Sequence, residues 1–172
     1  VLSGDIGTVN VNTDNTYHVV TYSGAMGSAG LEGFVITEGY ANGTTNIIVN
    51  AAMFYPYNGA GMYNITSSPA IKNVTITGNA AFSSTPSGGG MYNQSSSPIL
   101  TKVIISNNTA AGSSYSYGGG MYNINSNAVL TNVSISSNTA TTSSSSSSSP
   151  NYSSAAGGGI YGQNSNLVLT NV

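Results

Sequence analysis

This chain has very few charged side chains. Its 172 residues include two Lys plus Arg and four Asp plus Glu, so that 3% of the residues are charged, whereas an ordinary soluble domain carries roughly 25%. Two cations cannot neutralise a row of phosphates, which argues against binding to nucleic acid or to an anionic membrane. The polar surface must instead be built from Ser, Thr, Asn and Gly. We therefore expect an extracellular or cell-surface protein.

Cysteine and long apolar runs are also missing. Without Cys the chain has no disulfide, no thiolate zinc site and no cysteine nucleophile. No apolar run approaches the roughly 18 residues of a membrane helix, so we expect no membrane insertion by this segment. Stability must come from backbone pairing and packing.

Internal repeats are the strongest feature that is present. One hexapeptide recurs as GAGMYN (59–64), GGGMYN (88–93), GGGMYN (118–123) and GGGIYG (157–162). A second motif keeps the same phase, as IKNVTITGN (71–79), LTKVIISNN (100–108), LTNVSISSN (130–138) and LTNV (169–172), with LEGFVITEG (31–39) as a divergent copy. The hexapeptides follow one another at steps of 29, 30 and 39 residues. Insertions confined to one loop per repeat are typical of a solenoid.

The fixed part of each repeat predicts strands. Val and Ile alternate with polar residues in V-T-I and V-S-I, and Gly triplets with β-branched residues oppose a helix. All length variation falls after Asn79, Asn108 and Asn138. We predict an all-β solenoid over 1–172, with one coil of about three short strands per roughly 30-residue repeat and a variable loop. Residues 1–58 would form divergent N-terminal coils, and 59–172 the GGGMYN repeats.

Stacked coils would place equivalent residues directly above one another. The predicted core ladder consists of Met62, Met91, Met121, Ile160, Ile71, Leu100, Leu130, Val74, Val103, Val133, Ile76, Ile105 and Ile135. An amide ladder of Asn79, Asn108 and Asn138 is expected at a corner, where Asn tolerates a left-handed backbone.

These repeats resemble a known family. GGGMYN followed by SSPILTKVIISNN, and VLSGDI followed by YHVV and LEGFVITEG, resemble the right-handed parallel β-helix modules of bacterial surface and secreted proteins, in particular the polymorphic outer-membrane protein repeats of autotransporter passengers. The resemblance implies a right-handed parallel β-helix. It implies little about function, because this scaffold carries adhesins, stalks, filaments, polysaccharide lyases and glycosidases.

A polysaccharide-cleaving enzyme is the alternative function, and few residues support it. Glycoside hydrolysis needs two carboxyls roughly 5–10 Å apart, and Glu32 and Glu38 lie near the two ends of one short strand segment. A lyase would need clustered acids and a cationic base, but the only cations, Lys72 and Lys102, occupy different phases of the repeat. His18 has no second His or Cys beside it. We predict no catalytic residues.

We also predict no cofactor and no metal site. The glycine runs continue with Met-Tyr-Asn and lack the Asp of calcium-binding β-rolls. Asp5 and Asp14 near the first coil are the one pair that an ion could use together with backbone carbonyls.

Tyrosines provide the best candidate for binding. Tyr63, Tyr92, Tyr122 and Tyr161 follow the inward Met or Ile, so they should form an aromatic ladder on the outer face of the coils. Such a ladder could grip glycans or a partner; alternatively, it packs under the variable loop or stacks for stability. Further tyrosines lie in the loops, at Tyr55, Tyr57, Tyr115, Tyr117 and Tyr152.

Asparagines in N-x-S/T sequons are possible glycosylation sites. They are Asn42, Asn64, Asn73, Asn93, Asn107, Asn132 and Asn151. The serine run at 143–149, followed by Pro150, resembles an O-glycosylated or flexible segment.

No polar capping repeat is recognisable at either end of the sequence. We therefore expect this segment to stack on itself, end to end or laterally, or on flanking coils of a longer chain. The function we predict is a non-catalytic structural or adhesive module of a filament, surface layer or stalk, with glycans or cell surfaces as further partners. Ice binding on a Thr face is a third alternative, although Thr75, Thr77, Thr101 and Thr131 form no unbroken T-x-T array.

Overall fold

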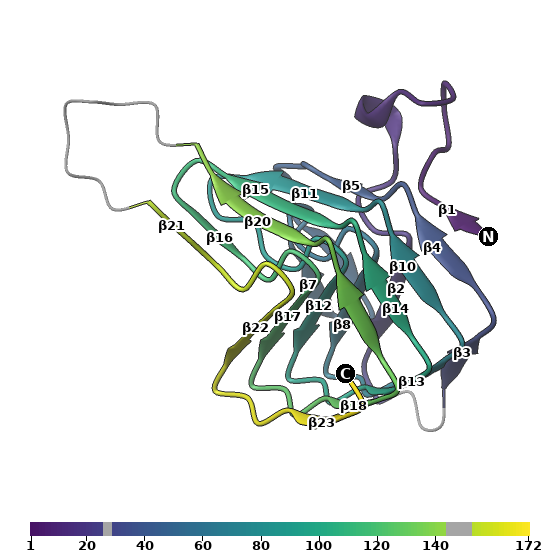
Figure 1. Ribbon diagram of the computed structural model, residues 1–172. Coiled ribbons are helices and arrows are strands. Elements are labelled where there is room, and N and C mark those ends of the chain that lie inside the picture. The colour runs from purple at the N-terminus through teal and green to yellow at the C-terminus, as the bar shows by residue number, and fades with distance from the viewer. Residues whose placement is uncertain (26–28, 144–152) are drawn as a thin grey trace.

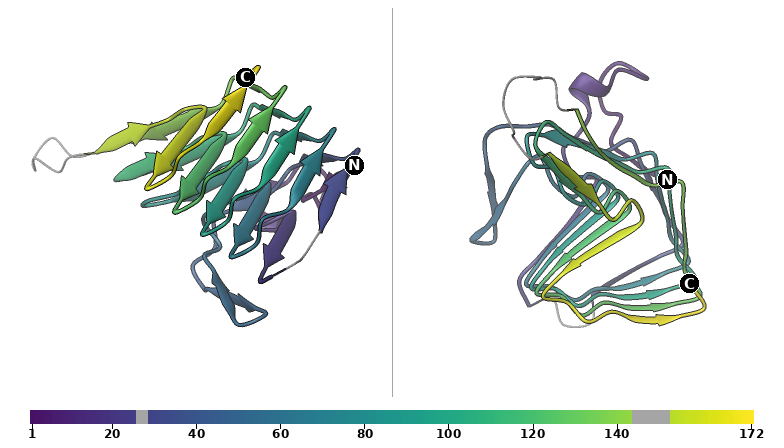
Figure 2. Two further views of the ribbon diagram at one scale, coloured as in Figure 1. Left: turned by 90° about the horizontal axis from the view of Figure 1, so that it is seen from below. Right: turned by 60° about the vertical axis from the view of Figure 1, so that its left-hand side comes forward.

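A computed structural model describes residues 1–25, 29–143 and 153–172, and it is an all-β parallel β-helix (Figure 1). Successive coils lie one above another, so that each strand pairs with its counterpart in the next coil (Figure 2). The fold predicted from the repeats is confirmed. Strands from 1–58 and from 59–172 belong to the same sheets.

Four parallel sheets form the walls, and we name each after its inward residues. The Met sheet contains β2 (Val20–Ser23), β8 (Met62–Ile65), β12 (Met91–Gln94), β17 (Met121–Ile124) and β22 (Ile160–Gln163). The Leu sheet contains β3 (Gly30–Glu32), β9 (Ala70–Lys72), β13 (Ile99–Thr101), β18 (Val129–Thr131) and β23 (Val168–Thr170). The Ile sheet contains β1 (Leu2–Ser3), β4 (Val35–Thr37), β10 (Thr75–Thr77), β14 (Ile104–Ser106) and β19 (Ser134–Ser136). The Ala sheet contains β5 (Tyr40–Ala41), β11 (Ala80–Ser83), β15 (Thr109–Gly112) and β20 (Thr139–Thr142).

Three smaller elements lie outside these walls. A 3-10 helix, η1 (Asn12–Asp14), interrupts the first coil. The antiparallel hairpin of β6 (Ile47–Val49) and β7 (Ala52–Phe54) is inserted after β5. Strands β16 (Tyr115–Tyr117) and β21 (Ser154–Ala156) pair in parallel beyond the Ala sheet.

The number of strands per coil differs from the sequence prediction. We expected about three strands, but a complete coil has four, because the stretch after Asn79 that we assigned to the variable loop begins with β11. The inward residues of the Ala sheet are Ala41, Ala81 and Ala110, and all three are fully buried. Alanines present too little apolar surface to stand out as a strand pattern, although they let this wall approach the others closely.

The register aligns the repeats as predicted. Met62, Met91, Met121 and Ile160 are direct partners on neighbouring strands. Between the Leu and Ile sheets the chain turns at a left-handed residue, such as Asn73 with φ 52°, which bends the strand direction sharply.

We expected the ladder asparagines to adopt the left-handed backbone conformation at the corner, but the residue before each of them does so. Positive φ angles occur at Gly78, Asn107 and Ser137, directly before Asn79, Asn108 and Asn138. The ladder asparagines themselves directly precede the strands of the Ala sheet, and their side chains point inward.

The core lies inside the four walls and follows the predicted ladder. Met91, Leu100 and Ile105 are fully buried, and so are their equivalents in the neighbouring coils except Ile135, which is partly buried. In the last coil the equivalents are less covered, and Leu169 is 52% exposed. None of the described residues forms a helix long and apolar enough to cross a membrane.

Candidate ligand groove

The tyrosine column lies on the outer side of the Met sheet, opposite the methionines, but it is not an open ladder. Tyr63 is fully buried, Tyr92 and Tyr122 are 7% exposed, and Tyr161 is half-buried. Tyr92, Tyr122 and Tyr161 stack with interplanar angles of 8°. Their ring faces therefore contact one another and are not free to stack on a sugar.

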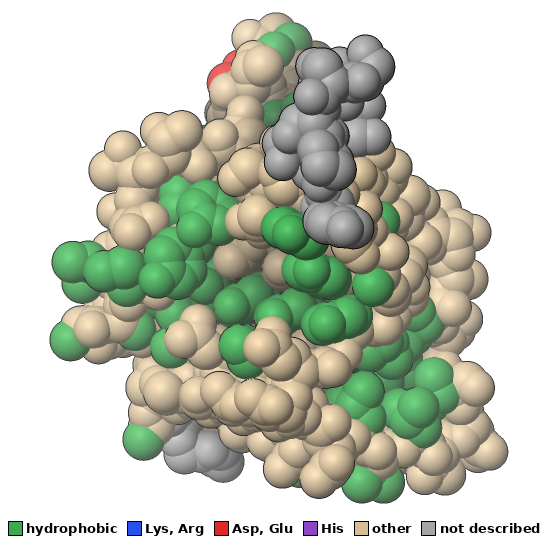
Figure 3. All heavy atoms as spheres, turned by 90° about the vertical axis from the view of Figure 1, so that its left-hand side faces the viewer, with side chains coloured by type: hydrophobic (Ala, Val, Ile, Leu, Met, Phe, Trp, Pro, Cys, Tyr) green, Lys and Arg blue, Asp and Glu red, His purple; other side chains and the backbone are tan. Residues whose placement is uncertain are grey.

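Irregular segments cover this column. Phe54 from the hairpin packs on Tyr63 at a centroid distance of 4.8 Å, and Tyr117 from β16 packs on Tyr161 at 4.7 Å. Figure 3 shows hydrophobic side chains gathered in a band across this face of the molecule. The outer side of the Met sheet is thus a second apolar cluster. Of the two alternatives for the tyrosines, packing and stacking applies to the buried members, and an open binding ladder does not.

His18 belongs to the same cluster. Its ring lies edge-on to Tyr63 at 5.1 Å, and its Nδ1 atom is 3.2 Å from the carbonyl oxygen of Gly59. Burial lowers the pKa of His18 from 6.5 to about 4, although contacts with the backbone of Gly59 and Asn58 oppose the shift. The imidazole is therefore neutral at physiological pH and packs as an aromatic side chain.

Two amide ladders run through the stack. In the predicted one, Asn79 Nδ2 donates to Asn108 Oδ1 at 3.0 Å, and Asn108 Nδ2 donates to Asn138 Oδ1 at 3.0 Å. The second was missed: its members are fully buried, and they bond in series at 2.7 and 2.8 Å. They are Asn64, Asn93 and Asn123. Alternation along Met-Tyr-Asn, with Met inward, places this Asn inward too and was the signal available in the sequence.

Two of the predicted glycosylation sites belong to the second ladder and are not accessible. Asn64 and Asn93 are fully buried and bonded to each other, so a glycan there would break the core. The remaining described sequon asparagines are exposed: they are Asn42, Asn73, Asn107 and Asn132. Asn151 and most of the serine run lie outside the described residues.

Each acidic residue has hydrogen-bond or ion-pair partners of its own. Glu32 forms an exposed ion pair with Lys72 at 3.1 Å and accepts a hydrogen bond from Asn73, and the Lys72 contact lowers the pKa of Glu32. Glu38 contacts Thr37 instead. Asp5 and Asp14 accept backbone N–H bonds from Asn10 and Thr8 within their own loop.

No metal-binding cluster is visible in the described ranges. Within them, no group of three or more His, Cys, Asp or Glu side chains lies close enough to hold a metal ion.

The second cation, Lys102, lies at a corner between two strands, where its backbone is left-handed with φ 54°.

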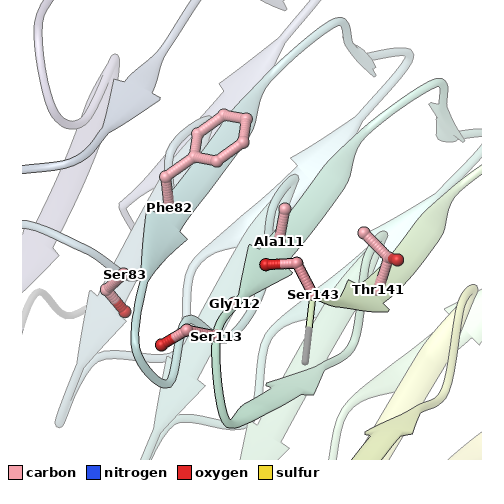
Figure 4. A pocket seen from close by; sticks show the side chains of 7 residues that line it. All are labelled: Phe82, Ser83, Ala111, Gly112, Ser113, Thr141 and Ser143. Atoms are coloured by element: carbon pink, nitrogen blue, oxygen red, sulfur yellow. The ribbon is translucent and has the colours of Figure 1, made fainter. Parts of the chain in front are cut away.

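A better-formed candidate site lies on the outer side of the Ala sheet, around Phe82. One pocket of about 310 Å³ is lined by Phe82, Ser83, Ala111, Gly112, Ser113, Thr141 and Ser143 (Figure 4). A second, of about 360 Å³, is lined by Asn42, Gly43, Thr44, Tyr57, Phe82, Ser83, Ser84 and Thr85. Because both pockets share Phe82 and Ser83, they form one surface that we call the Phe82 groove.

The groove runs across the strands, along the solenoid axis. Phe82, Ala111 and Thr141 are direct partners on β11, β15 and β20, so each coil contributes one outward residue. Phe82 also packs against Tyr40 at a centroid distance of 5.0 Å. Ala111, the next residue along this row, presents only a methyl group, which leaves a hollow beside the Phe82 ring.

The chemistry of the groove is neutral. Its lining offers an aromatic ring at Phe82, another at Tyr57, the amide of Asn42 and several Ser and Thr hydroxyls. Among the described residues of the lining, the Tyr57 phenol is the one ionisable group. Burial raises the pKa of Tyr57, which keeps the phenol protonated. Each pocket lies near the lower end of the roughly 300–1,000 Å³ that small-molecule sites occupy. Sequence reasoning missed this groove because its residues vary from one repeat to the next.

Comparisons with protein-family models, with curated proteins and with solved structures found no match.

Proposed function

We propose that this chain is a non-catalytic, extracellular β-solenoid module with structural and adhesive roles, and that it binds neutral glycans in the Phe82 groove. The observation that carries the proposal is the combination of an aromatic ring, amide and hydroxyl groups in an uncharged groove on a continuous sheet. Aromatic faces pack against the C–H groups of sugars, while amides and hydroxyls exchange hydrogen bonds with sugar hydroxyls.

The direction of the groove supports a linear ligand. Its residues come from successive coils that are stacked in register, so a chain of sugar units could follow the axis and meet a new row of side chains at each coil, about 4.8 Å further on. A rigid sheet loses little conformational entropy when it binds, which favours weak, repeated contacts of this kind.

The last coil supports the structural role. Leu169 is 52% exposed, whereas its partner Leu130, one coil earlier, is fully buried. A further coil of the same fold, from the same or another molecule, would bury Leu169 and pair with the edges of β22 and β23.

The test is an array of neutral and charged oligosaccharides, followed by titration calorimetry on those that bind. Phe82→Ala and Tyr57→Ala should each lower the affinity for neutral glycans by about tenfold or more, equivalent to 1.4 kcal/mol. Tyr115→Ala, which removes a 39% exposed aromatic outside the groove, is the matched control and should bind normally. Binding that survives both groove variants would contradict the proposed site.

A further inference from the structure

Tyrosine rings form a continuous chain along the outer side of the Met sheet. The successive centroid distances are 6.2, 4.7, 5.5, 5.1 and 4.6 Å. In order, the rings are Tyr115, Tyr117, Tyr161, Tyr122, Tyr92 and Tyr63.

Access to this chain is graded from one end to the other. Tyr115 is 39% exposed, Tyr117 and Tyr161 are half-buried, and Tyr63 at the far end is fully buried. A solvent-borne reagent therefore meets the Tyr115, Tyr117 and Tyr161 end first. Charge can then pass between rings, because neighbouring π systems lie close together.

The buried end is a poor place for an oxidised ring. A phenol that loses an electron must also lose its proton, and the Tyr63 Oη atom is buried away from the solvent that would take it up. Burial also raises the pKa of Tyr63 and of Tyr92. Oxidised tyrosines are therefore favoured at the solvent-exposed end of the row of rings, where the phenol can release its proton to water.

Tyr117 and Tyr161 form the closest pair at that end. Their centroids are 4.7 Å apart, with planes tilted by 35°, so the ring carbons next to the hydroxyl-bearing carbons can meet after a small rotation. Tyr122, the next ring inward, is held by a 2.7 Å hydrogen bond from its hydroxyl to Gln163.

We propose that Tyr117 and Tyr161 are a modification site, at which one-electron oxidants in the solvent produce an intramolecular dityrosine cross-link. Each phenol gives one electron to an oxidant and one proton to water. The two resulting radicals join through a new carbon–carbon bond between their ortho carbons. The hydrogens on those carbons then move to the oxygens, which restores both phenols. In total the protein loses two hydrogen atoms, and two oxidant molecules are each reduced by one electron.

The cross-link would fasten two coils together. Tyr117 ends β16, in the loop of one coil, and Tyr161 lies in β22 of the next. A covalent bond between them closes a loop that includes the serine run, and so restricts the unfolded chain as a disulfide would. This chain has no cysteine, so dityrosine is a covalent cross-link that its residues can supply.

The experiment exposes the dilute, full chain to a photogenerated ruthenium(III) tris-bipyridine complex and maps the products by mass spectrometry after proteolysis. The expected result is a linked peptide pair, containing Tyr117 and Tyr161, that is lighter by two hydrogens than the separate peptides. Its appearance should accompany a rise in Tm of several degrees.

Phenylalanine variants make the test specific, because they keep the ring and remove the phenol. Tyr117→Phe and Tyr161→Phe should each abolish this product, whereas Tyr40→Phe, whose ring neighbour is Phe82, should leave its yield unchanged. Cross-links found only between molecules, or only through other tyrosines, would overturn the proposal. So would an unchanged yield in Tyr161→Phe.

Discussion

The two sides of the Met sheet show two ways to bury a strand. On the inner side, Met62, Met91 and Met121 are fully buried by apolar residues at equivalent positions of the adjacent coils and by the other walls. On the outer side, Tyr63 is fully buried, but Tyr161 is only half-buried, because the cover comes from segments that differ between coils. The repeat therefore builds the inner core, and the insertions determine where the outer side is closed and where it is open.

Removing an inner side chain should have the largest effect. Met91→Ala leaves a cavity that the stacked coils cannot close, and should lower the free energy of unfolding by about 2–5 kcal/mol. Tyr161→Ala, on the half-open outer side, should cost less. Chemical denaturation of both variants measures the difference, and equal losses would contradict the distinction between the two sides.

Acid should weaken the outer side through His18. The unfolded chain takes up a proton near pH 6.5, but the folded chain does so only near pH 4. Stability is therefore complete above pH 6.5, falls as the pH drops from 6.5 to 4, and changes no further through this group below pH 4. At about 1.4 kcal/mol per pKa unit, the loss is roughly 3 kcal/mol.

His18→Phe serves as the control for this pH dependence. It keeps an aromatic ring beside Phe54 and Tyr63 and removes the titrating group. Denaturation curves recorded between pH 4 and pH 7 should be steeply pH-dependent for the wild type and nearly flat for the variant. A variant that keeps the full slope would show that another group is responsible.

Breaking the buried amide ladder should have an intermediate effect. Asn93→Ala leaves Asn64 Nδ2 and Asn123 Oδ1 without their partners, and a buried unsatisfied polar group costs about 1–3 kcal/mol. Asn42→Ala, at an exposed sequon, should leave the denaturation midpoint almost unchanged. If Asn93→Ala were equally harmless, the ladder would contribute no stability.

The smallest effect is expected from a single hydroxyl on the outer side. Tyr122→Phe removes the 2.7 Å hydrogen bond to Gln163 and should cost about 1 kcal/mol. Tyr161→Phe, whose ring is half-buried, should cost less. Thermal unfolding of the two variants measures the difference, and an equal or larger loss for Tyr161→Phe would contradict it.

The sequence predicted the parts of this fold that repeat. Met62, Met91 and Met121 recur at nearly constant spacing, and they lie in direct register on neighbouring strands. Physically, a parallel stack forces equivalent residues into equivalent environments, so periodicity in the sequence reports burial directly. The Asn79, Asn108 and Asn138 ladder was predictable for the same reason.

Features that occur only once were not predictable in this way. The hairpin that places Phe54 over Tyr63 has no counterpart among the described residues of the other coils, and the Ala sheet has small inward residues with no clear apolar alternation. The Phe82 groove depends on both, because it lies between the Ala sheet and the segment that leads to the hairpin. Contacts between non-equivalent segments decide this site, and the repeat carries no information about them.

The most direct test of the proposed function is a nuclear magnetic resonance titration of the chain with a neutral oligosaccharide selected on the array. The account predicts chemical-shift changes at the amides of Phe82, Ser83, Ala111 and Gly112, with Met91 unchanged, and an affinity that does not depend on salt because the groove is uncharged. Shift changes confined to residues outside the groove, or binding that weakens steeply with salt, would contradict it.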